Sequence, residues 1–119
     1  MGFVLRRPGT VIQEPLEDTG ITVSYKVPDA QTAAEIKKLI ISASKNEMRI
    51  PDILPDIFGP ILVSLENVDF EGQSSYKFET DKAGRLTEDS LSPVIPLTAA
   101  LQRFVLEKIG LETVDRKNL

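Results

Sequence analysis

Carboxylates are the most plentiful reactive side chains in this 119-residue chain, which has 18 Asp and Glu but no His and no Cys. General acid–base catalysis by carboxylates needs two of them held close, in surroundings that move their pKa values apart. Asp69 and Glu71 flank Phe70 and would share one face of a strand. In a loop they could chelate a hard cation, but their spacing lacks the Asp-x-Asp-x-Asp-Gly pattern of a calcium loop. We therefore interpret Asn67–Gly72 as a solvated acidic loop.

Most other small-enzyme chemistries lack their residues here. Without His or Cys there is no imidazole base, thiol nucleophile or Cys-based zinc site. The scattered glycines form neither a Walker A loop nor a Gly-x-Gly-x-x-Gly turn. A Ser-Lys dyad within Ser42–Lys45 stays open. We predict a protein that is not an enzyme and has no catalytic, cofactor-binding or metal-binding residue; a small carboxylate- or metal-dependent enzyme is an alternative.

The charge balance bears on the partners of the chain. Its 14 Lys and Arg against 18 Asp and Glu leave a formal charge of −4. Nucleic-acid binding depends mainly on Lys and Arg that neutralise phosphates, so no nucleic-acid partner is expected. No window approaches the roughly 20 apolar residues that span a bilayer. We expect a cytoplasmic protein without a membrane partner.

The first half of the chain predicts a strand and a helix. Apolar and polar residues alternate over 21–27, and several are β-branched, which is typical of a strand. Pro28 ends this strand, and Asp29 is a suitable N-cap for a helix over Asp29–Ser44; Thr32 with Glu35 offers an alternative capping box. The residues before the strand, Gln13–Gly20, are predicted to form a loop.

The middle of the chain is ambiguous because prolines interrupt an apparently helical stripe. Pro51, Pro55 and Pro60 each disfavour a continuous helix. We predict a short helix over Pro51–Phe58 and a second helical piece that starts at Pro60. The alternative is a strand over Ile61–Leu65.

The remaining elements are short, except for one helix. We expect a loop over Asn67–Ser75, a strand over Tyr76–Phe78 and a turn over Asp81–Gly84. Thr87 is predicted to cap a short helix that Pro93 ends. A last helix begins near Pro96 and ends at Gly110; its apolar face consists of Leu97, Leu101, Phe104, Val105 and Ile109.

Together these patterns predict an α+β fold. A small antiparallel sheet from the N-terminal strands and the Tyr76–Phe78 region packs against two principal helices. The length suits a single domain over 1–119. It would carry an N-terminal extended arm over 1–20 and a frayed polar tail over 112–119.

Two apolar segments are candidates for binding a partner protein. The first is punctuated by proline and consists of Ile53, Leu54, Ile57 and Phe58. Such a segment cannot form a long regular element, so it can stand on the surface as a docking patch; the alternative is a buried irregular connection. The second is the arm Phe3–Ile12, in which Phe3 and Leu5 could help to add a strand to a neighbouring sheet edge.

The order of segments resembles the tail assembly chaperones of bacteriophages and prophages. The chain opens with Leu5-Arg6-Arg7-Pro8, and Leu62–Gly72 is similar to the central phrase of that family. Leu86–Leu91 resembles its helix start, and Ala99-Ala100-Leu101 with Lys117-Asn118 resembles its end. The chain departs from the family pattern at Leu65, where Trp is usual, and at Asn67, which replaces Gly.

The resemblance implies a non-enzymatic tail assembly factor in the host cytoplasm. Such a protein binds the tape measure or other tail proteins and shields their apolar helical surface until the tube forms. One alternative is a structural subunit of a phage particle or of another symmetric assembly, in which case the chain binds itself.

Overall fold

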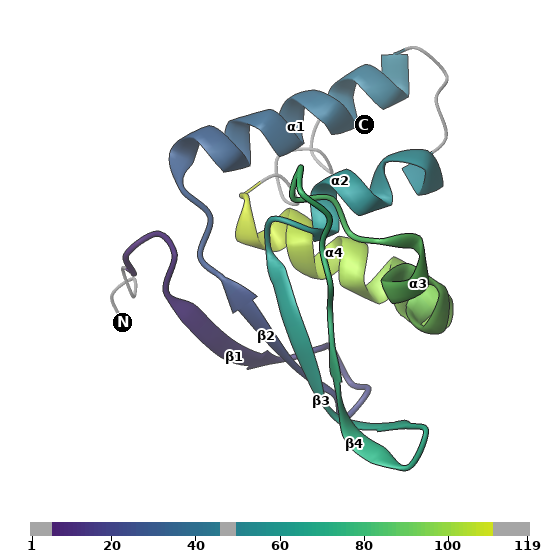
Figure 1. Ribbon diagram of the computed structural model, residues 1–119. Helices are drawn as coiled ribbons and strands as arrows, with labels where there is room; N and C mark the ends of the chain where they lie inside the picture. Colours follow the sequence, from purple (N-terminus) through teal and green to yellow (C-terminus); the bar gives the residue numbers. More distant parts are fainter. Residues whose placement is uncertain (1–5, 46–49, 111–119) are drawn as a thin grey trace.

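The computed structural model describes residues 6–45 and 50–110 (Figure 1). Phe3, Leu5 and the tail over 112–119 lie outside these residues. The predicted α+β class is confirmed. The described elements, in chain order, are β1 (Val11–Pro15), β2 (Thr22–Lys26), α1 (Ala30–Lys45), η1 (Ile50–Ile53), α2 (Leu54–Phe58), β3 (Leu62–Phe70), β4 (Gln73–Lys77), α3 (Glu88–Leu91), η2 (Ser92–Leu97) and α4 (Thr98–Lys108).

The four strands form one antiparallel sheet in the order β1-β2-β3-β4. Figure 1 shows α4 behind the strands, with α2 and then α1 above it in this view. The register places one set of alternating side chains on the face toward the helices, and these are buried: Ile12, Val23, Tyr25, Leu65 and Tyr76. The opposite face carries exposed side chains that include Gln13, Lys26, Ser75 and Lys77.

The segment after Pro60 is strand β3, so the helix expected to start there is wrong and the strand alternative is right. Two buried residues three positions apart, Leu62 and Leu65, imitate helical spacing. The cause is a bulge: Leu65 pairs with Val23, but Leu62 pairs with Tyr25, so β3 holds one extra residue between them. Both leucines therefore face the core from an extended chain.

The loop expected over Asn67–Ser75 is also wrong, because most of it lies in strands β3 and β4. Strands β3 and β4 form a hairpin in which Phe70 pairs with Gln73. The two residues between them, Glu71 and Gly72, have φ of 50° and 84°, as a type I′ turn requires. The acidic segment is thus the end of a strand and a tight turn, within which Asp69 Oδ1 accepts a hydrogen bond of 3.3 Å from the Gly72 amide.

The N-terminal expectations hold only in part. The strand predicted over 21–27 is confirmed as β2. The loop expected over Gln13–Gly20 is wrong where β1 pairs along β2. Within the extended arm expected over 1–20, residues 11–15 form this strand. The side chains of Ile12 and Leu16 enter the core, with Leu16 fully buried. Hydrophobic burial on one face thus turns this segment into an edge strand.

The two long helices are confirmed, but α4 begins at Thr98 and not near Pro96, which lies in the 3-10 helix η2. The Asp29 carboxylate accepts a 2.7 Å hydrogen bond from the Thr32 amide, so Asp29 caps α1 and the capping box is not used. Helix α1 packs on η1 and α2. Helix α4 buries most of its predicted apolar face, and Gly110 follows its end with φ of 77°. Thr87 caps α3 by accepting from the Ser90 amide at 3.2 Å.

The expected exposed patch of Ile53, Leu54, Ile57 and Phe58 is wrong, because all four side chains are at most 5% exposed. The short helix predicted there is confirmed as η1 and α2, but it lies between α1 and α4 as a buried connection. Gly59 shows how tightly it packs: a Cβ there would lie 2.1 Å from the Gly84 carbonyl oxygen. The prolines break the helix, and the apolar residues between them then fill the core.

Candidate functional site

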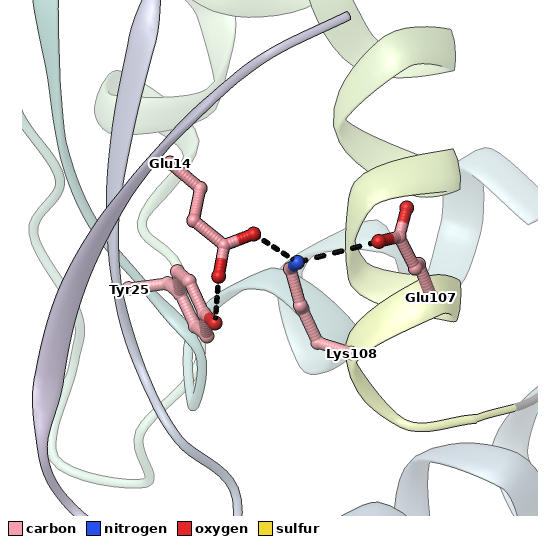
Figure 2. Close-up of polar contacts among 4 residues, drawn as sticks. All are labelled: Glu14, Tyr25, Glu107 and Lys108. Carbon is pink, nitrogen blue, oxygen red and sulfur yellow. Dashed lines mark hydrogen bonds and ion pairs between the residues drawn. The ribbon is translucent and has the colours of Figure 1, made fainter. Parts of the chain in front are cut away.

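A hollow of 480 Å³ lies between the β1 edge of the sheet and α4. Lys108 lines this hollow. Its ammonium group pairs with the Glu14 carboxylate and lies 3.5 Å from the Glu107 carboxylate (Figure 2). The second carboxylate oxygen of Glu14 accepts a 2.7 Å hydrogen bond from the Tyr25 hydroxyl. We call Glu14, Tyr25, Phe104 and Lys108 the Lys108 cluster.

Aromatic rings hold the ammonium group of Lys108 in place. Its Nζ lies 4.7 Å from the ring centre of Phe104 and 5.2 Å from that of Tyr25. The two rings meet edge to face with centres 5.3 Å apart. The Lys108 side chain is only 12% exposed, so its charge interacts with the rings and the carboxylate in partly desolvated surroundings. At the rim, the Arg103 guanidinium binds Glu17 through both carboxylate oxygens, at 2.6 and 2.9 Å.

These contacts set the protonation of the cluster. Burial raises the pKa of the Glu14 carboxyl, but hydrogen bonds from Lys108 and Tyr25 and the Lys108 charge outweigh it, so the pKa lies below its usual 4.5. Burial, and then the hydrogen bond to Glu14 and its charge, raise the pKa of Tyr25 above its usual 10. At neutral pH Glu14 is therefore ionised and Tyr25 protonated.

The Lys108 cluster therefore works as a clamp between α4 and the first two strands. The Glu14 carboxylate already accepts hydrogen bonds from the Lys108 ammonium group and the Tyr25 hydroxyl, one on each oxygen. These are the two oxygens that acid–base chemistry would use. The rim carboxylate of Glu17 is likewise engaged by Arg103, and this hydrogen bond lowers the pKa of Glu17. No sequence pattern indicates the cluster, because Tyr25 and Lys108 are 11 and 94 residues from Glu14 and no local spacing connects them.

A second site lies at the other end of the sheet, along strand β4. A hollow of 240 Å³ is bounded by β4 and by Asp89 and Ser90 of α3. A smaller one of 110 Å³ is lined mainly by apolar side chains of β3 and η2. The two hollows share Phe70 and Tyr76, whose rings meet edge to face with centres 4.8 Å apart.

Ser90 connects the surroundings of β4 to α3. Its backbone carbonyl accepts a hydrogen bond from the Tyr76 hydroxyl, and its own hydroxyl oxygen accepts one of 2.9 Å from the Glu79 amide. Ser90 is buried, and so is Tyr76. The inner side of β4 is therefore rigidly held, while its outer side is not paired with any strand among the described residues.

The ladder shows which backbone groups point outward from β4. The Phe78 amide donates to the Val63 carbonyl at 3.0 Å, and in the same register Tyr76 pairs with Leu65. Because the direction alternates along an antiparallel ladder, the N–H and C=O groups of Ser75 and Lys77 point away from the sheet. We call the outward groups of these two residues, with the two adjacent hollows, the β4 edge.

The outer side of β1 differs. The Leu16 amide donates to the Ile21 carbonyl, and the Val27 amide donates to the Thr10 carbonyl. By the same alternation, residues 11, 13 and 15 direct their backbone groups outward. Pro15 has no N–H, so one of the three outward donors is missing, as is typical of a protected edge strand.

Of the candidate catalytic residues from the sequence, Asp69 lines the 110 Å³ hollow, but no second candidate joins it there. Asp69 and Glu71 lie at the β3–β4 turn and are exposed, and within residues 6–45 and 50–110 no three acidic side chains form a group that could hold a metal ion. Ser42 and Lys45 are both exposed on α1. None of the helices in the described part of the chain has the length and apolar character to cross a bilayer.

Comparisons with known proteins leave the family open. The chain matches no family model, and no curated protein or solved structure matches it.

Proposed function

We propose that this protein is a non-enzymatic assembly factor that binds other proteins along the β4 edge. The observation that carries the proposal is the combination of outward backbone groups at Ser75 and Lys77 with two hollows that share Phe70 and Tyr76. An extended segment of a partner can add to such an edge as a further strand. Main-chain hydrogen bonds then supply affinity, and hollows that receive alternate side chains supply specificity.

The charged hollow supports a structural role over catalysis. Glu14 and Glu17 are each engaged by a cation of α4, so the hollow's charge pairs join the helix to the sheet. A firmly joined helix layer is useful for a binding protein, because it presents the sheet edge as a rigid template.

We further propose tail assembly in bacteriophages or prophages as the setting, with the tape measure or other tail proteins as partners in the host cytoplasm. The sequence resemblance at Leu5–Pro8 and Leu62–Gly72 supports this. The binding mode differs from the expected one: a strand edge takes the place of an apolar helical surface, since the expected patch is buried.

Affinity purification from cells that produce the tail proteins tests the proposal. The Ser75→Pro variant removes an outward N–H from β4, and Gln13→Pro removes one from β1 as the matched control. We expect mass spectrometry to identify a tail protein with the wild type and Gln13→Pro but not with Ser75→Pro. Equal recovery with all three proteins, or recovery of no tail protein, would contradict the proposal.

A further inference from the structure

The β4 edge has dimensions that select its occupant. Strand β4 is five residues long, and its outward groups at Ser75 and Lys77 can pair with a segment of similar length. Tyr76, between them, faces the hollows, so alternate side chains of an added strand would lie beside its ring. The occupant is therefore a short extended segment with apolar residues two positions apart.

Residues 1–5 of this chain have that composition. Four of the five are apolar and none is charged. Phe3 and Leu5 are two positions apart, so in a strand their side chains share one face. We propose that the β4 edge binds residues 1–5 of a second copy of this chain as a fifth strand; the inference rests on the proposed function, since it names the partner of the same edge.

The same molecule cannot supply this strand to itself. Arg6, the first described residue, shares a hollow with Glu14, Tyr25 and Lys108 at the β1 end of the sheet. A position beyond β4 is four strand spacings away from β1, about 19 Å. Five extended residues reach at most about 18 Å, which leaves none to pair with β4. The strand must come from another copy.

Charge also favours this occupant. Arg6 and Arg7 directly follow the apolar residues and are exposed. Carboxylates lie at both ends of β4: Asp69 and Glu71 precede it, and Glu79 and Asp89 line the hollow at its other end. In either strand direction the arginines therefore lie near two carboxylates, which outnumber the one cation of the edge, Lys77, and add attraction at low ionic strength.

The donor and acceptor lie at opposite ends of one sheet, so each contact joins two different surfaces. A surface that binds a different surface of the next copy makes a head-to-tail contact. Such contacts close into a ring if the rotation allows and otherwise extend into a filament. We therefore expect a ring or a filament, or a two-fold dimer where two copies exchange their segments reciprocally.

Light scattering coupled to size-exclusion chromatography, over a concentration series of the full chain, tests this inference. We expect the wild type and Gln13→Pro to exceed the 13.2 kDa monomer mass as concentration rises. Ser75→Pro should associate at least about tenfold more weakly, because the added strand loses a bond and meets the proline ring. Leu5→Asp should weaken association similarly without altering the described fold, which circular dichroism checks.

The outcomes separate this inference from the proposed function. A wild type that stays monomeric throughout overturns the inference. So does association that Ser75→Pro or Leu5→Asp leaves unchanged. Should the protein remain monomeric while Ser75→Pro still loses a tail protein, the edge has another occupant and only the proposed function stands. Association lost in both variants, without any tail protein bound, supports self-assembly alone.

Discussion

The two ends of the sheet carry similar aromatic pairs, but different interactions join each end to the helices. At the β1 end, Tyr25 meets Phe104 of α4, and Lys108 and Glu14 add an ion pair above the rings. At the β4 end, Tyr76 meets Phe70, and its hydroxyl donates to a backbone carbonyl of α3. An ion pair thus joins the β1 end to the long helix α4. Neutral contacts join the β4 end to α3, which has four residues.

The difference shows that the two edges of one sheet, both without a neighbouring strand among the described residues, can differ in what supports them. The clamp and Pro15 commit the β1 end to the protein's own core and reduce its outward donors. The β4 end has neither, although Lys77 and the irregular pairing of β3 between Glu66 and Phe70 limit how far a strand can extend along it. Binding is therefore expected at β4, and the main electrostatic contribution to stability at β1.

Removing one aromatic ring from each end should give the largest contrast. Phe104 is buried, and its ring supports both Tyr25 and Lys108, so Phe104→Ala should lower the free energy of unfolding by about 3 kcal/mol. Phe70 is only half-buried, so Phe70→Ala should cost about 1 kcal/mol. Urea unfolding followed by circular dichroism measures both. Equal losses of unfolding free energy in the two variants would show that the two aromatic pairs stabilise the fold to the same extent.

Neutralising the lysine should have the next largest effect. Lys108→Met keeps an apolar chain between the rings but leaves Glu14 without its cation. Loss of one partner from a partly buried pair should lower the free energy of unfolding by about 2 kcal/mol, less than for a fully buried pair. Lys77→Met on the exposed face of β4 is the control and should change it by under about 0.5 kcal/mol. A similar loss in both variants would argue against the clamp.

The smallest expected effect is the pH dependence of the clamp. Because the pKa of Glu14 is lowered in the folded protein, its stabilising contribution is fully present above the unfolded-state value near 4.5. The contribution is lost as pH falls through the lower folded value. The gap in unfolding free energy between the wild type and Glu14→Gln should thus shrink by about 1 kcal/mol or less from pH 7 to pH 3, since Glu14 is partly exposed. A gap that does not change with pH would mean that the ion pair contributes nothing.

Local patterns in the sequence predicted an element correctly where a residue type has one clear structural role, such as capping a helix. Asp29 before a helical stripe, Thr87 before a short helix and Gly110 after the last one each satisfy backbone groups that helix ends leave open. Alternation over 21–27 likewise predicts β2. These elements can be read without knowing the rest of the fold, because their hydrogen bonds form within a few residues.

Patterns failed where distant partners decide the outcome. The spacing of Leu62 and Leu65 fits a helix as well as a bulged strand, and only pairing with β2 on one side and β4 on the other makes it a strand. The segment from Ile53 to Phe58 has the composition of either a docking patch or a core. Its burial follows from the packing of α1 and α4 around it.

The sequence alone determined the charge balance, the lack of His and Cys, the positions of the two long helices and the α+β class. Tertiary structure decided which edge is clamped to the last helix and which lies beside the two smaller hollows. Glu14, Tyr25 and Lys108 come together only because β1 pairs with β2 and α4 crosses behind them. Contacts between residues so far apart in the chain depend on how the core packs as a whole, and no local spacing records that.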